Sequence, residues 1–149
     1  MKNTKKNNNM LLTLVGGEIM RIIRICDLLG YTHVKNHYYI TENGNVFSFY
    51  KNEWRAKAKR IKKKYYYVNM MTHESDKSKD FRVNRIVATA FCLNLYNSPV
   101  ADHIDGNKLN NHYLNLQWVT HSQNTKFANG EMYRNQIDIY NLSDTFSLI

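Results

Sequence analysis

The stretch VADHIDGNKLNNHYLNLQWVTHSQNTKF, residues 100–127, holds most of the chain's distinctive chemistry. It sets an acid beside a histidine, Asp102-His103, just before a turn pair, Asp105-Gly106. Residues 100–104 have the composition of a strand, and neighbours on a strand point to opposite faces. The acid and the imidazole can therefore share a site only if the strand ends there, which the turn pair predicts.

The pattern continues with a loop and a second strand. Residues 107–115 are polar, and we expect Leu109 and Leu114 to anchor this loop. Residues 116–119 read as a strand that carries Leu116 and Trp118 on one face.

A helix follows the second strand. Thr120 and Gln123 stand at the spacing of a capping box, which predicts a helix that starts at about His121. The pair at 129–130, Asn-Gly, is a typical helix stop. Residues 100–130 are thus predicted to fold in the order β-β-α.

Upstream of this segment, the sequence predicts a packing helix and a small sheet. Residues 83–92 place apolar side chains at helical spacing. Residues 38–40 and 46–50 flank Asn43-Gly44 and read as a hairpin. Residues 22–29 are apolar on most sides, so a short buried helix and a strand fit them equally well.

The positive charge of the chain is clustered. The formal net charge is +9, and residues 51–64, KNEWRAKAKRIKKK, hold eight Lys or Arg against one Glu. Residues 65–71, which begin with three tyrosines, follow and have the composition of a strand. Basic residues interleaved with aromatic ones suit binding to nucleic-acid phosphates. The alternative is a solvated face whose lysines prevent edge-to-edge strand pairing.

Composition restricts the setting of the protein. Cys26 and Cys92 are far apart and form no C-x-x-C pair, which argues against a zinc ribbon or a disulfide framework; we expect two small buried side chains. No stretch has the length or the cleavage pattern of a membrane span or a signal peptide. We expect a cytoplasmic protein with no membrane partner, in the host cell cytoplasm if a phage encodes it.

Taken together, these motifs resemble the HNH endonuclease family, in the branch typical of phage homing endonucleases. The resemblance rests on VNRIVATAF, DHIDGNKLNN, NLQWVT and SQN, all within residues 81–128. It implies an α+β protein in which a basic antiparallel β-rich arm precedes a ββα-metal (His-Me finger) nuclease module. We divide the chain into a poorly ordered leader (1–19), an N-terminal helix with a basic β-hairpin DNA-binding region (20–80), the HNH module (81–130) and a short tail (131–149). The natural start could be Met1 or Met20.

The resemblance assigns roles to four residues. It makes His103 the general base and Asp102 a metal ligand, with Asn115 bracing the loop and the histidine. Asn124 would be the second ligand of one divalent ion per site, Mg²⁺ or Mn²⁺. Carboxylate and amide oxygens suit such an ion, which helps to neutralise a phosphodiester under attack. We interpret His112 and His121 as loop and helix residues.

The resemblance also implies a function and partners. We expect a monomer that cleaves double-stranded DNA and needs no small-molecule cofactor; the alternative is a catalytically inactive DNA-binding protein with the same fold. Asn84 departs from the family pattern, where many relatives carry His, and this affects local structure only. The expected DNA-contacting residues are basic or aromatic: Arg55, Lys57, Lys59, Arg60, Lys62, Lys63, Lys64, Tyr66, Arg82 and Arg85.

Overall fold

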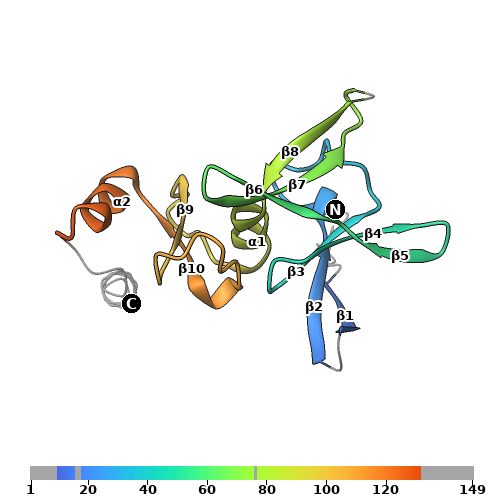
Figure 1. Ribbon diagram of the computed structural model, residues 1–149, viewed down its shortest axis with the longest axis horizontal. Coiled ribbons are helices and arrows are strands. Elements are labelled where there is room, and N and C mark those ends of the chain that lie inside the picture. The colour runs from blue at the N-terminus through green and yellow to red at the C-terminus, as the bar shows by residue number, and fades with distance from the viewer. Residues whose placement is uncertain (1–9, 16–17, 76, 132–149) are drawn as a thin grey trace, which may run out of the picture.

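A computed structural model describes residues 10–15, 18–75 and 77–131. The fold is α+β, as the sequence predicts, with antiparallel strands in three small sheets. Helix α1 (Val83–Phe91) lies at the centre, with strands β9 (Val100–His103) and β10 (Leu116–Val119) on one side and the larger sheets on the other (Figure 1).

The largest sheet has the order β1-β2-β3-β4-β5. Its strands are β1 (Met10–Val15), β2 (Glu18–Arg24), β3 (Tyr38–Thr41), β4 (Val46–Tyr50) and β5 (Glu53–Ala56).

Two expectations about the N-terminal part are corrected. Residues 10–15 fall in the expected leader, yet they form β1, because antiparallel pairing with β2 gives backbone groups of the two strands hydrogen-bond partners. Residues 1–9 lie outside the described residues. Between 20 and 80, the segment expected to be a helix is strand β2 followed by one 3-10 turn, η1 (Ile25–Asp27). Apolar side chains on most sides suit a buried strand as well as a helix, so periodicity could not decide.

The predicted hairpin joins β3 and β4. Gly44 has φ +82°, while Asn43 keeps an ordinary negative φ, so only the glycine supplies the left-handed conformation. Hydrogen bonds from Thr41 N to Asn45 O (2.9 Å) and from Gly44 N to Thr41 O (3.0 Å) close the turn. This turn, residues 42–45, is called the β3–β4 turn below.

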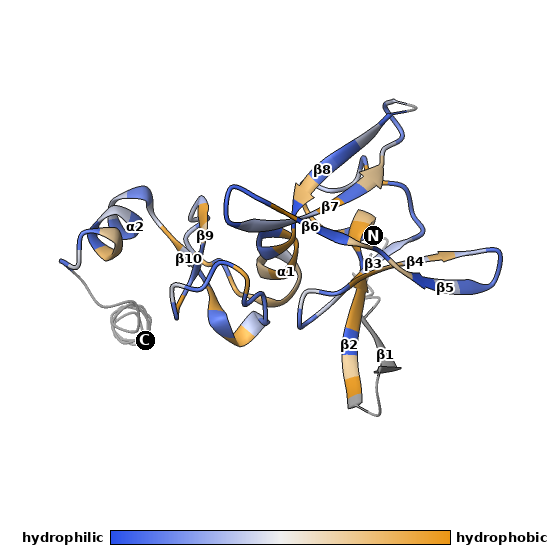
Figure 2. Cartoon of the chain, viewed as in Figure 1, coloured by the Kyte–Doolittle hydropathy of each residue, from blue (hydrophilic) through white to orange (hydrophobic). Residues whose placement is uncertain are grey.

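The basic run supplies β5 and the first strand of a three-stranded sheet, β6 (Lys59–Lys62), β7 (Tyr65–Met71) and β8 (Ser78–Arg82). Figure 2 shows mainly hydrophilic colours along β5 and β6. The two-residue turn between β6 and β7, Lys63-Lys64, has positive φ at both positions (49° and 70°). Asn and Gly are the residues usually found in such turns, so two lysines there are strained.

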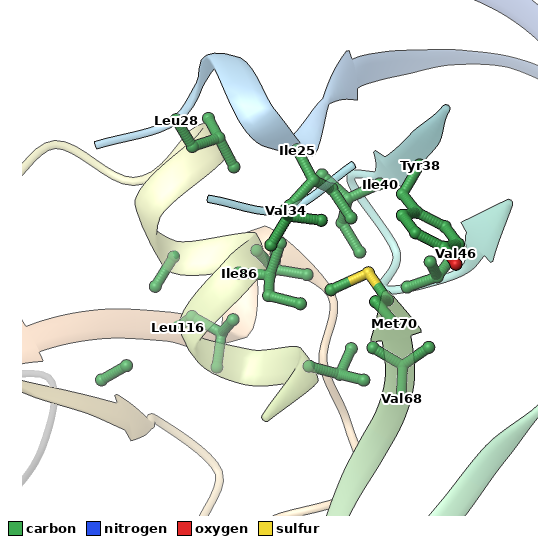
Figure 3. Packing of buried hydrophobic residues seen from close by; sticks show 14 residues of the cluster. Ile25, Leu28, Val34, Tyr38, Ile40, Val46, Val68, Met70, Ile86 and Leu116 are labelled. Atoms are coloured by element: carbon green, nitrogen blue, oxygen red, sulfur yellow. The ribbon is translucent and has the colours of Figure 1, made fainter. Parts of the chain in front are cut away.

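Helix α1 links the sheets through one hydrophobic core. Val83, Ile86, Val87 and Ala88 are buried on it. They pack with side chains from β3, β4, β7, β9, β10 and the 25–34 segment (Figure 3): Ile25, Leu28, Val34, Tyr38, Ile40, Val46, Val68, Met70, Ala101 and Leu116. Trp118 packs against this cluster together with Leu116, which confirms that the two share a face of β10.

The predicted β-β-α order is confirmed. Strands β9 and β10 pair antiparallel, and a short 3-10 turn, η2 (Tyr113–Asn115), precedes β10. Helix α2 (His121–Ala128) begins with the predicted capping box, and Asn129 is its C-cap. It packs on the two strands through Phe127, Val119 and Val100.

Two smaller findings complete the fold. Cys26 and Cys92 are free and only half-buried, and burial raises the pKa of the Cys92 thiol to about 11. In the described part of the chain, no helix has the length and apolar character needed to cross a bilayer.

Candidate active site

Strand β9 ends at the position that the proposed site requires. The strand stops at His103, whose carbonyl accepts from Gly106 N at 2.9 Å, and Ile104 N donates to Asn115 O at 2.9 Å. Both Asp102 and His103 are buried, at 9% and 3% exposure. The geometric condition set by the sequence, a strand that breaks near Ile104, is met.

Asp102 is held from the neighbouring strand. Its cross-strand partner in the register is Gln117, whose Nε2 donates to Asp102 Oδ2 at 3.2 Å. A carboxylate has about four acceptor positions, so this bond orients the group and is compatible with a role as a metal ligand. On the other side of β9, Asn84 of α1 donates to Ala101 O at 3.0 Å and ties the helix to the strand.

The side chain of His103 has a partner that the sequence analysis missed. Its Nε2 lies 2.9 Å from Oδ1 of Asn111, which is itself buried at 4% exposure. Burial lowers the pKa of His103 below its usual value, against the opposing effects of Asn111 and the Asp102 and Asp105 carboxylates. A lowered pKa keeps the imidazole neutral near pH 7, the form that can accept a proton.

Asn115 braces the loop at residues 105–110. Its Nδ2 donates to Asp105 Oδ1 and to Asn110 O, both at 2.9 Å, and its Oδ1 accepts from Asp105 N at 3.1 Å. Its link to the histidine runs through the backbone, by the bond from Ile104 N. The direct side-chain contact to His103 comes from Asn111 instead.

The expected leucine anchors of this loop are wrong. Leu109 and Leu114 are 38% and 69% exposed. Polar groups hold the loop instead: Asn110 Nδ2 donates to Asp105 Oδ2 at 2.8 Å, and Tyr113 N donates to Glu42 O of the β3–β4 turn at 2.8 Å. Short-range Asn and Asp bonds can define a loop without apolar burial.

Asn124 lies on α2, the helix that packs against β9. It precedes buried Phe127 by three residues, so both lie on the strand-facing side of the helix. Asn124 is half-buried there, and its amide oxygen could serve as a metal ligand. Asp102 and Asn124 together offer hard oxygen donors, which fit Mg²⁺ or Mn²⁺. Among the described residues there is no cluster of three or more His, Cys, Asp or Glu.

The three-stranded sheet of β6, β7 and β8, called the basic sheet below, reaches His103 through Tyr65. The Tyr65 and His103 ring centroids are 6.1 Å apart. Arg82 and Lys108 both lie over the Tyr65 ring, with the guanidinium carbon at 4.6 Å and Nζ at 4.9 Å from its centroid. The strained Lys63-Lys64 turn directly precedes Tyr65. Positive charge therefore gathers beside the proposed base, and Tyr65 and Lys108 are additions that only the tertiary fold reveals.

The other predicted DNA-contacting residues are distributed more widely. Arg60 pairs with Asp80 at 2.6 Å, and Lys62 lies 3.8 Å from the same carboxylate. Arg55 pairs with Glu53 on β5, in the other large sheet. Lys57 lies over the Tyr38 ring, with Nζ 5.6 Å from the centroid.

Three further residues of the predicted set are engaged within the fold. Lys59 Nζ donates to Gly44 O at 3.1 Å and to Asn45 Oδ1 at 3.0 Å, so its charge points into the β3–β4 turn. Tyr66 lies beneath it, with Lys59 Nζ 5.0 Å from the ring centroid. Arg85 donates to Pro99 O at 2.8 Å and lies over Trp118.

Comparisons with known proteins identify relatives of this chain. Residues 83–126 match the model of the family described as HNH endonuclease, a stretch that contains α1, β9, β10 and most of α2. The DNA endonuclease I-HmuI of Bacillus phage SP01 is 36% identical over 100 residues, which cover 67% of this chain and 54% of the relative. The chain belongs to the HNH endonuclease family.

Other similarities support the membership of this protein in the HNH endonuclease family. An HNH endonuclease of Acanthamoeba polyphaga mimivirus is 38% identical over 89 residues, 60% of this chain and 26% of the relative. A solved structure that concerns DNA binding and cleavage by the HNH homing endonuclease I-HmuI aligns with a TM-score of 0.58 and 32% identity, covering 74% of this chain and 60% of that one. The HNH chain thus spans between a quarter and about half the length of these two curated relatives.

Proposed function

We propose that this HNH protein is a metal-dependent DNA endonuclease of the homing type. The observation that carries the proposal is the gathering of a buried acid, a buried imidazole and a basic, aromatic-lined surface around the end of one strand. The similarity to I-HmuI, whose solved structure concerns DNA binding and cleavage, supports the same activity. Double-stranded DNA is the proposed partner, bound by a monomer.

His103 is proposed to act as the general base. A water molecule beside the scissile phosphate would give its proton to the neutral imidazole and attack phosphorus, and the bond to the leaving oxygen would break. Asp102 and Asn124 are proposed to hold one Mg²⁺ or Mn²⁺. Bound there, the ion would neutralise charge that develops on the phosphate and leaving oxygens. Asn115 is proposed to keep the end of β9 and the 105–110 loop in place.

The basic sheet is proposed to position the DNA backbone. Two lysines in a strained turn support this role, because Asn and Gly would form the turn at lower cost. Arg82 and Lys108, stacked on Tyr65, would place cationic groups near the phosphate that His103 serves. Exposed Arg60 and Lys62 extend the same surface.

The decisive experiment compares the chain with its His103→Ala variant. Supercoiled plasmid is incubated with each protein and Mg²⁺, and open-circle and linear products are measured. The proposal expects cleavage by the unaltered chain, its arrest by EDTA, and restoration by Mg²⁺ or Mn²⁺. His103→Ala should cleave at least about a hundredfold more slowly while binding DNA with similar affinity.

Two outcomes would decide against parts of the proposal. Equal cleavage by the variant would remove His103 as the base. DNA binding without any cleavage by the unaltered chain, in either metal, would favour the inactive DNA-binding alternative.

A further inference from the structure

We infer that Asn111 is a positioning residue for His103: it fixes the imidazole so that Nδ1 is the atom that takes the proton, and the β3–β4 turn holds Asn111 in place. The inference deepens the proposed function and rests on it for the role of His103 as the general base. The side-chain arrangement itself can be tested in protein that has no activity.

The first step concerns the proton on the ring. A neutral imidazole has one N–H and one bare nitrogen, and a carbonyl oxygen can only accept. Nε2 lies 2.9 Å from Asn111 Oδ1, and we assign the ring hydrogen to Nε2, which then donates it to that oxygen. Nδ1 is then the bare nitrogen. The bond also fixes the rotation of the ring about its Cβ–Cγ axis, which aims Nδ1 in one direction.

The second step concerns why an amide occupies this position. Asn111 is almost fully buried, and its Nδ2 has no hydrogen-bond partner among the described residues. A buried donor without a partner costs free energy that an apolar side chain would avoid. The acceptor on the other side of the same amide is the feature that an apolar residue could not supply. The contact between Oδ1 and His103 is therefore the reason we give for an amide at this position, despite the free-energy cost of its unpaired Nδ2.

The third step concerns what holds Asn111. A Cβ built on Gly44 would lie 2.8 Å from Asn111 Cβ, 3.2 Å from Val83 Cγ1 and 3.3 Å from Asn111 O. The backbone of the turn is thus in direct contact with the residue that orients the histidine. Lys59 Nζ in turn binds the carbonyl of Gly44 from strand β6. The basic sheet, the turn, Asn111 and His103 form one continuous chain of contacts.

The test of the first step is spectroscopic. The protein is labelled with ¹⁵N-histidine and studied without metal, at a pH high enough for the His103 ring to be neutral. The chemical shifts of the two ring nitrogens then report which nitrogen carries the hydrogen. His103→Ala identifies the signal among those of the six histidines. We expect a pure Nε2–H form in the unaltered chain and in Asn111→Asp, which keeps an acceptor oxygen, and a mixed population in Asn111→Leu.

The kinetic arm uses single-turnover nicking of supercoiled plasmid with Mg²⁺, beside DNA affinity measured in EDTA. Asn111→Leu should lower the nicking rate by about a hundredfold, as expected for a misplaced reacting group, with DNA affinity unchanged within about twofold. Asn111→Asp should recover part of that rate, since it restores the acceptor. An Nδ1–H form in the unaltered chain, or an unchanged rate and unchanged shifts in Asn111→Leu, would overturn the inference.

A matched pair of glycines tests the third step. Gly44 and Gly30 have nearly equal φ angles, +82° and +83°, so alanine is equally strained at both. At Gly30, however, an added Cβ meets nothing within 4 Å. Gly44→Ala should slow nicking by about tenfold or more and alter the His103 shifts, whereas Gly30→Ala should do neither. Equal behaviour of the two variants would remove the turn from the inference.

An inactive unaltered chain would count against the proposed function alone. In that case the ¹⁵N shifts of the Asn111 and Gly44 variants still decide whether Asn111 positions the ring.

Discussion

Replacing Asn115 by alanine should destabilise the protein through the 105–110 loop. The side chain makes three hydrogen bonds, two of them to Asp105 and one to Asn110 O. A net hydrogen bond contributes about 1 kcal/mol, and more to a charged group. Because Asp105 and Asn110 are exposed, water replaces part of each loss, and we expect a fall in unfolding free energy of about 2 kcal/mol.

The prediction carries a pH signature. Slight burial raises the pKa of Asp105, but hydrogen bonds from Asn110, from Asn115 and from the Asn107 backbone outweigh it, so the folded-state pKa is lowered. A lowered pKa means that the carboxylate stabilises the fold fully above its unfolded value of about 3.9 and loses this contribution as pH falls through the folded value. The deficit of Asn115→Ala should therefore be full at pH 7 and shrink below about pH 4.

The assay is urea unfolding followed by circular dichroism at pH 7 and at successively lower pH. Asn107→Ala is the matched control, because the Asn107 side chain accepts a single exposed bond, from Leu109 N at 3.1 Å. It should cost well under 1 kcal/mol. If the two variants were equally stable, or if the deficit of Asn115→Ala did not change with pH, the bracing role would be refuted.

Three further variants test the Lys63-Lys64 turn, the inward-pointing Lys59 and the cap of α2. Lys63→Asn with Lys64→Gly should relieve the turn and raise stability by about 1 kcal/mol, yet reduce the salt slope of DNA affinity by about one to two units; an unchanged slope would place the turn away from DNA. Lys59→Met should lower stability and leave DNA binding unchanged, because it removes the donor to Gly44 O and Asn45 Oδ1 in the β3–β4 turn. Thermal denaturation should show a fall in unfolding free energy of about 1 to 2 kcal/mol, and the salt slope of DNA affinity should stay the same. Thr120→Ala should remove the cap of α2, cost about 1 kcal/mol and weaken Mg²⁺ binding through Asn124; calorimetric titration that finds unchanged affinity would separate the helix from the metal site.

The features predictable from the sequence are those with a local signal. The capping box needs two side chains three residues apart, and both bonds form, with Gln123 N to Thr120 Oγ1 at 3.2 Å and Thr120 N to Gln123 Oε1 at 2.8 Å. The turn after His103 and the glycine of the β3–β4 hairpin are equally local. Each depends on residues that are neighbours in the chain, so composition and spacing suffice.

The features that sequence reasoning missed depend on tertiary contacts. The loop holds several asparagines of similar appearance, and only its path selects Asn111, eight residues beyond His103, as the partner of the ring. Tyr65 reaches the site from a different sheet. Lys59 belongs to a run of cations in which no local pattern marks the one whose amine turns inward. The resemblance to HNH proteins could transfer roles only to the motif positions that it matched.

The position of α1 has a consequence for exchanging parts between related proteins. The helix is covered on one side by the arm, through β3 and β7, and on the other by β9 and β10. Its nine residues therefore pack against both parts of the protein at once. A chimera that joins this module to another arm must carry over the arm side chains that face α1, or else alter Val83, Ile86 and Val87 to match the new surface. The boundary between the two parts is therefore defined by the side chains that pack on the two sides of the helix. No single position in the sequence separates them.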